Sequence, residues 1–126
     1  EGHADFTLVF RLLAQALRGD SKPARLLFEE PVAFDIWEQR WRTRIEQDGI
    51  TAETRLQLMD RVNPIYIPRN HKVEEALTAA VNHNDMIPFS NLLSVLSHPF
   101  DEVLGKEAYT RPAPASDAPY RTYCGT

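Results

Sequence analysis

The segment RVNPIYIPRN, residues 61–70, lies at the centre of the chain and decides how the rest can fold. Pro64 and Pro68 each remove a backbone donor and bias the preceding residue toward extended backbone, so a regular helix cannot run through the segment. Two roles are open for it. It is either a rigid connector between two helical layers, or a recognition loop built from its Asn, aromatic and Arg side chains. The flanking sequence favours the connector.

Apolar residues recur at helical spacing on both sides of this connector. Before it, stripes of this kind predict helices at four places: residues 5–18, 23–30, 32–48 and a segment that begins after Thr51. After it, two more helices are expected, one capped by Asn70 and one by Asp85. No strand pair with a turn signal and no repeat is visible. The sequence therefore predicts an all-α bundle of about six helices over residues 1–96.

Particular residue types set the expected helix ends and buried faces. The expected caps and stops are Asp5 and Thr51 as N-caps, Gly19 and Gly49 as C-terminal stops, and Pro31 as the end of the second helix. Two stripes are expected to face inward after the connector: Val73, Leu77, Ala80 and Val81 in one, and Phe89, Leu92, Leu93 and Leu96 in the other.

Residues 97–126 form a tail of a different kind. Four of the nine prolines and Gly105 lie in it, which excludes long regular structure. Its aromatic residues are Phe100, Tyr109, Tyr120 and Tyr123. Disordered segments are usually poor in aromatic residues, so we expect a Pro-rich extended strap that packs on a surface.

Composition argues against several classes of function. The chain has 14 Lys and Arg against 18 Asp and Glu, a formal net charge of -4, so no basic field attracts nucleic acid or a membrane surface. No apolar run approaches the roughly 20 residues that span a bilayer. The single Cys cannot form an internal disulfide or a thiolate metal cage. Because the chain begins at Glu1 rather than Met, we expect it to be part of something longer.

No catalytic or metal-binding constellation is visible in the sequence. Nothing matches a Gly-rich phosphate loop, a His-Glu-x-x-His helix or a Cys-x-x-Cys pair. The histidines are scattered at spacings that place no two on adjacent turns of one helix: His3, His71, His83 and His98. Adjacent carboxylates such as Glu29 and Glu30 point about 100° apart on a helix and are interpreted as solvated. No catalytic, cofactor-binding or metal residue is therefore assigned.

Two groups of residues are given structural roles. Trp37 and Trp41, four residues apart on a helical stripe, are interpreted as core, with a stacked planar ligand as the alternative. The connector residues are Asn63, Pro64, Tyr66, Arg69 and Asn70. Tyr66 is expected to be buried between helical layers. Arg69 is expected to pair with a neighbouring carboxylate, with anion binding as the alternative.

Several stretches resemble one known family. MDRVNPIYIPRNHKVEEALTAAVNHND, residues 59–85, is similar to the Arg-x-Asn-Pro-x-Tyr-x-x-Arg-Asn segment and Ala-rich helix of the selenoprotein O or YdiU family. LLSVLSHPFDE, residues 92–102, resembles the family's Leu-rich helix that runs into Pro-aromatic-Asp-Glu. The ending YCGT, with Cys124 third from the end, resembles the family's terminal Cys- or selenocysteine-containing tripeptide. ADFTLVFRLL and WEQRWRTRI also resemble family helices.

The resemblance implies a role within a larger enzyme. The family consists of pseudokinase-fold enzymes that transfer AMP from ATP onto protein hydroxyls, and this chain resembles only their C-terminal helical part. It implies that the full-length protein, called the parent below, is an enzyme that uses ATP and Mg²⁺. It also implies that this chain alone is no enzyme and holds no cofactor. The implied partners are the rest of the polypeptide and protein substrates. The 97–126 tail is expected to pack either on the bundle or on the catalytic part. The implied location is the bacterial cytoplasm, or the mitochondrion in a eukaryote.

Two questions stay open at this stage. The resemblance implies that Cys124 is a redox handle that meets a second Cys in the catalytic portion; a free thiol on a frayed terminus is the alternative. The rival function is a stand-alone helical adaptor that binds a partner helix or peptide in a groove beside Trp37 and Trp41. A third possibility is an independent small-molecule enzyme.

Overall fold

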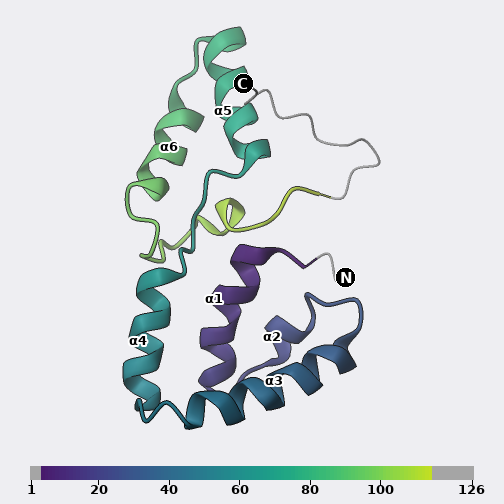
Figure 1. Ribbon diagram of the computed structural model, residues 1–126. Helices are drawn as coiled ribbons and strands as arrows, with labels where there is room; N and C mark the ends of the chain where they lie inside the picture. The colour runs from purple at the N-terminus through teal and green to yellow at the C-terminus, as the bar shows by residue number, and fades with distance from the viewer. Residues whose placement is uncertain (1–3, 115–126) are drawn as a thin grey trace, which may run out of the picture. The chain divides into compact units, whose positions relative to one another are not determined.

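The computed structural model describes residues 4–114, which form six α-helices and a 3-10 helix and contain no strand (Figure 1). The elements are α1 (Phe6–Leu17), α2 (Lys22–Arg25), α3 (Pro31–Glu46), α4 (Ala52–Val62), α5 (Asn70–His83), α6 (Ile87–Leu96) and η1 (Glu107–Tyr109). The predicted all-α class is confirmed. The chain groups into two compact units, Glu1–Ile65 and Tyr66–Thr126, whose boundary falls inside the connector. The division at residue 96 and the extended strap stay predictions.

The expected helix ends in the first unit are confirmed where a side chain or glycine defines them. The Asp5 carboxylate accepts a hydrogen bond from the Leu8 amide (2.9 Å), and the Thr51 hydroxyl accepts one from the Thr54 amide (3.2 Å). Gly19 and Gly49 have φ of 104° and 66°, in the left-handed region that favours glycine. Local side-chain chemistry therefore sets these boundaries.

Three expectations about helix ends are wrong: the role of Pro31, the length of the second helix and the role of Asn70. Pro31 begins α3 instead of ending the previous helix, because the first helical position needs no amide donor and suits the fixed φ of proline. The helix expected over 23–30 is only the single turn α2, and Leu26 beyond it is 69% exposed. Asn70 is the first residue of α5, and Arg69 occupies the N-cap position expected for Asn70.

The first unit is held by a small apolar core and by arginines. Its core is Leu13, Ala24 and Phe34, with Val9, Leu12, Phe28, Trp41 and Met59 packed against it. Asp60 on α4 pairs with Arg11 of α1 (3.0 Å) and with Arg18 (2.7 Å), the C-cap residue of α1, and Figure 1 shows α1 and α4 side by side. Arg42 on α3 donates to the Ala16 carbonyl (2.6 Å) near the end of α1, where a cation complements the helix dipole.

The second unit is built on a hairpin of α5 and α6 (Figure 1). Asn84 ends α5 in the left-handed conformation. The Asp85 carboxylate accepts from the Ile87 amide (2.9 Å), but Met86 occupies the N-cap position of α6 that was expected for Asp85. The buried residues of the two helices are Ala76, Leu92 and Val95. Four residues expected to face inward are instead exposed: Leu77, Val81, Phe89 and Leu93. A two-helix hairpin covers one stripe of each helix, so the second apolar stripe has no cover within it.

Tyr66 anchors the segment that follows α6. It is 2% exposed, so Tyr66 is buried as expected, while its expected place between helical layers stays a prediction. Its amide donates to the Pro99 carbonyl (3.2 Å). Its hydroxyl accepts from the Val103 amide (3.0 Å) and donates to the Val103 carbonyl (3.4 Å). The connector therefore holds the chain beyond α6 through three hydrogen bonds made by one residue.

Replacement of Tyr66 tests this anchor. Tyr66→Ala is expected to lower the unfolding free energy of the chain by about 3 kcal/mol, because it deletes a buried aromatic ring. Tyr66→Phe keeps the ring and loses only the hydroxyl bonds to Val103, so its cost should be about 1 kcal/mol. Urea denaturation followed by circular dichroism gives both values. A cost below about 0.5 kcal/mol for Tyr66→Ala, the range of surface substitutions, would show that Tyr66 is not an anchor.

Candidate functional site

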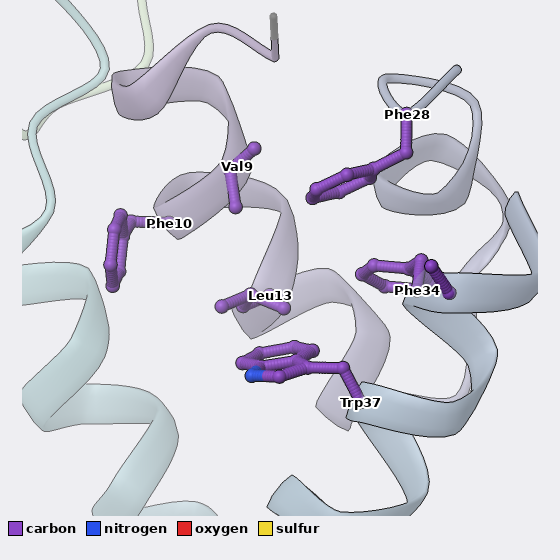
Figure 2. A pocket seen from close by; sticks show the side chains of 7 residues that line it. Val9, Phe10, Leu13, Phe28, Phe34 and Trp37 are labelled. Carbon is purple, nitrogen blue, oxygen red and sulfur yellow. The ribbon is translucent and has the colours of Figure 1, made fainter. Parts of the chain in front are cut away.

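An apolar pocket of about 280 Å³ opens in the first unit between α1 and α3. Its lining residues are Val9, Phe10, Leu13, Phe28, Ala33, Phe34 and Trp37. Figure 2 shows Phe28, Phe34 and Trp37 facing Val9 and Leu13, with Phe10 on the α1 side. The two helices and the turn before α3 therefore form the walls.

Aromatic rings give the α3 side of this pocket its shape. Phe28 and Phe34 have ring centroids 5.0 Å apart, and Phe34 and Trp37 are 5.9 Å apart. Trp37 stacks on Trp41 at 5.6 Å with an interplanar angle of 10°, so a planar ligand cannot lie between the two indoles. Trp41 packs against the core as expected, whereas Trp37 is 38% exposed at the pocket wall. The core interpretation is right for Trp41 and wrong for Trp37.

The pocket can bind apolar groups but offers no catalytic chemistry. Apart from the indole N–H of Trp37, its lining side chains carry no polar atom, so nothing in the lining can act as nucleophile, acid or base. On the same helix as Phe10, Phe6 is 76% exposed and its ring lies 4.7 Å from that of Phe10. The apolar surface thus extends along α1 beyond the pocket. An aliphatic or aromatic side chain of a partner matches this chemistry.

A second hollow of about 250 Å³ in the same unit contains charged groups that already have partners. Arg55 donates to the Ile45 carbonyl (2.9 Å) and to Asp48 (3.2 Å). Arg42 binds Glu38 (2.7 Å) as well as the Ala16 carbonyl. These arginines hold helix ends together, and the hollow is assigned no ligand.

The five connector residues do not form one site. Asn63 ends α4, and its carbonyl accepts a long 3.5 Å hydrogen bond from Arg11; Pro64 follows it, partly buried. Tyr66 and Arg69 belong to the second unit, where both are buried, and Asn70 lies exposed at the start of α5. The carboxylate partner expected for Arg69 stays a prediction. Cys124 lies outside the described residues.

Within residues 4–114, no three His, Cys, Asp or Glu side chains gather closely enough to hold a metal ion. The pKa of His71 is lowered, first by burial and then by the charges of Lys72 and Arg69. Over the same described range, no helix has the length and apolar character needed to cross a membrane.

The sequence did not identify Val9, Phe10 or Ala33 as pocket residues, because a stripe of apolar residues gives no sign of whether a second helix covers it.

Comparison with known proteins gives the chain its family. No family model matches it. A protein nucleotidyltransferase YdiU of Mycobacterium sp. (strain KMS) is 50% identical over 126 residues, which is 100% of this chain and 24% of that protein. The proteins of the same name from Bradyrhizobium sp. and Rhodopseudomonas palustris are each 44% identical over 98% and 100% of this chain.

These relatives are much longer than the chain, which spans about a quarter of their length. The matches nonetheless cover the whole chain at 43–50% identity. The family resemblance expected from the sequence is thereby confirmed. The chain belongs to the protein nucleotidyltransferase YdiU family, and it corresponds to the C-terminal part of its members.

Proposed function

We propose that this chain is the C-terminal helical domain of a protein adenylyltransferase, which transfers AMP from ATP to protein hydroxyls, and that it braces the catalytic part of that enzyme. One observation carries the proposal: the open apolar pocket between α1 and α3, with exposed apolar side chains beside it. The chain spans about a quarter of its relatives, so the remaining three quarters of the parent can supply the surface that covers this pocket.

The energetic argument rests on apolar area. Full burial of a Phe, Ile or Leu side chain is worth about 1.5–3 kcal/mol, so even partial cover of Phe6, Phe10 and Trp37 gives a stable contact. Isolated exposed apolar residues need no explanation, but a group of them around a pocket marks an interaction site. An adaptor that binds a separate helix would use the same pocket. The brace is favoured because homologues carry this segment as part of a longer polypeptide.

The described residues do not fit ATP or Mg²⁺. Phosphoryl and nucleotidyl transfer need cations around the triphosphate and carboxylates that hold the metal ion. The pocket is apolar, and no metal-ligating group of three is found in residues 4–114. We therefore assign no step of the transfer to these residues, and the catalytic groups are proposed to lie in the rest of the parent.

Calorimetry tests this assignment. Titration of the 126-residue chain with ATP and Mg²⁺ is expected to give no saturable heat, because the chain offers no site for the triphosphate. The full-length parent, titrated under the same conditions, serves as the positive control. A micromolar ATP site in the 126-residue chain would contradict the proposal that this chain is a brace and that ATP binds to the rest of the parent.

A charge placed in the pocket tests the brace. Ala33 is exposed and lines the pocket, so Ala33→Glu should change the unfolding free energy of the isolated chain by less than about 0.5 kcal/mol. In the full-length parent, the same carboxylate would be buried against an apolar partner. The parent is expected to lose at least about 1 kcal/mol of stability, and part of its transfer rate.

The matched control is Gln39→Glu, which adds the same charge at an exposed position of α3 outside the pocket lining. It should leave the stability and the transfer rate of the parent unchanged. Equal effects of Ala33→Glu and Gln39→Glu in the parent would exclude the pocket as the bracing surface. Loss of a separate protein partner, with the parent's own stability unchanged, would instead support the adaptor.

We also propose that Cys124 is a redox handle. Support comes from the resemblance of the YCGT ending to the family's terminal Cys-containing tripeptide. As the single Cys of this chain, it needs a partner thiol from the parent's catalytic part. Two thiols would lose two protons and two electrons to an oxidant such as hydrogen peroxide, and the disulfide would tether the tail to the catalytic part.

Oxidation of the parent tests this handle. Hydrogen peroxide is expected to slow adenylyl transfer by forming an intramolecular disulfide, and dithiothreitol should restore the rate. Cys124→Ser should remove the sensitivity, because the tether can no longer form. The control is the rate of each protein under reducing conditions, which should be equal. If Cys124→Ser and the parent are inhibited equally by peroxide, Cys124 is an ordinary free thiol.

A further inference from the structure

The pocket of the first unit lies between two rows of side chains, one on α1 and one on α3. Each row has members at positions i, i+4 and i+7, which share one helix face: Phe6, Phe10 and Leu13 on α1, and Ala33, Trp37 and Arg40 on α3. All but Phe6 and Arg40 line the pocket (Figure 2). We call the pocket together with these two rows the α1–α3 groove.

The lining of the groove determines which backbone form can occupy it. Every backbone N–H and C=O group that a partner buries there needs a hydrogen-bond partner. The lining side chains carry no polar atom except the indole N–H of Trp37, and the backbone of α1 and α3 is paired within each helix. An extended segment would therefore bury unpaired backbone groups, which is costly, whereas a helix pairs its own. The groove thus selects an α-helix with an apolar face.

Three ionised side chains beside the groove make no ion pair within residues 4–114: Glu29, Glu30 and Arg40. All three are exposed, and Glu30, the N-cap residue of α3, makes no side-chain cap bond. Glu29 and Glu30 directly follow Phe28 of the pocket lining, and Arg40 ends the α3 row. At 1.5 Å per residue, Glu30 and Arg40 are about 15 Å apart along the helix axis. The groove is therefore acidic at the start of α3 and basic almost three turns later.

The rest of the parent polypeptide can supply such a helix. The chain spans about a quarter of its relatives and corresponds to their C-terminal part. In the parent, the polypeptide therefore enters the first unit just before α1, next to Phe6, an exposed member of the α1 row. A segment tethered this close to the groove has a high effective concentration there.

We propose that one amphipathic helix of the parent, from the segment that precedes Glu1, occupies the α1–α3 groove. The proposal rests on the bracing role and names the element that covers the pocket. Apolar residues of this helix at i, i+4 and i+7 contact the two rows. A Lys or Arg near one end faces Glu29 and Glu30, and an Asp or Glu about ten positions away faces Arg40. The charges set the orientation, because the reversed helix would bring like charges together.

Hydrogen exchange of the full-length parent, measured by mass spectrometry, locates the helix. Ala33→Glu is expected to raise amide exchange about fivefold, the factor that corresponds to roughly 1 kcal/mol, in α1 and in one upstream segment. Gln39→Glu, outside the pocket lining, should change neither. The sequence of the affected segment should show the apolar spacing and the two opposite charges about ten positions apart.

The outcomes separate this proposal from the brace. If Ala33→Glu raises exchange in several scattered segments, or in one without helical periodicity, the brace stands and the proposed helix is wrong. If Ala33→Glu changes no exchange in the rest of the parent, the brace itself fails.

Charge reversal tests the orientation of the helix. Arg40→Glu should raise the exchange of the upstream segment in the parent, because it places a carboxylate against the acidic residue of the helix. Gln39→Glu adds the same group one position away and is the matched control. Replacement of that acidic residue by Lys should restore protection in the Arg40→Glu parent. Equal effects of Arg40→Glu and Gln39→Glu, or no rescue by the Lys replacement, would overturn the proposal.

Discussion

One constraint determines this structure: its short helices cannot bury all of their apolar side chains. Among the described residues, ten apolar side chains are buried and four of these are alanines, whereas eighteen large apolar side chains are exposed. In the first unit α1 contacts α2 and α4, and in the second α5 contacts α6, so these short helices leave part of their apolar surface in water. The chain therefore supplements a small apolar core with specific ties and keeps a considerable apolar surface available for contact.

The ties are few and lie at helix ends. Asp60 joins α1 to α4, and Arg42 joins α3 to the last turn of α1. In the second unit, Tyr66 binds the backbone at Pro99 and Val103, and Lys72 and Lys106 contact the ring of Tyr109. The Pro-rich connector thus fixes the segment after α6, which leads toward the C-terminus. In a bracing domain, such ties would keep the pocket in shape before the partner surface binds.

Local chemistry made much of this fold predictable from sequence. Helical periodicity, the caps Asp5 and Thr51, and the burial of Tyr66 follow from residue types and their neighbours. The exposed stripe through Leu77 and Val81 was not predictable, because apolar spacing identifies a face but not what covers it. The rival adaptor function placed a groove beside Trp37, but the α1 wall of the pocket was not predicted, because Phe10 belongs to a stripe that suggests a core. The contact of Lys72 with the Tyr109 ring joins residues far apart in the sequence, which no local pattern encodes.

Hydrogen exchange offers the most direct test of the claim that this chain braces a larger enzyme. Amide exchange of α1 and of the first half of α3, which line the pocket, is compared between the 126-residue chain and the full-length parent. The account predicts much slower exchange of both helices in the parent, since a covered pocket suppresses local opening. Identical exchange in the two proteins would mean that nothing covers the pocket, and would contradict the bracing role.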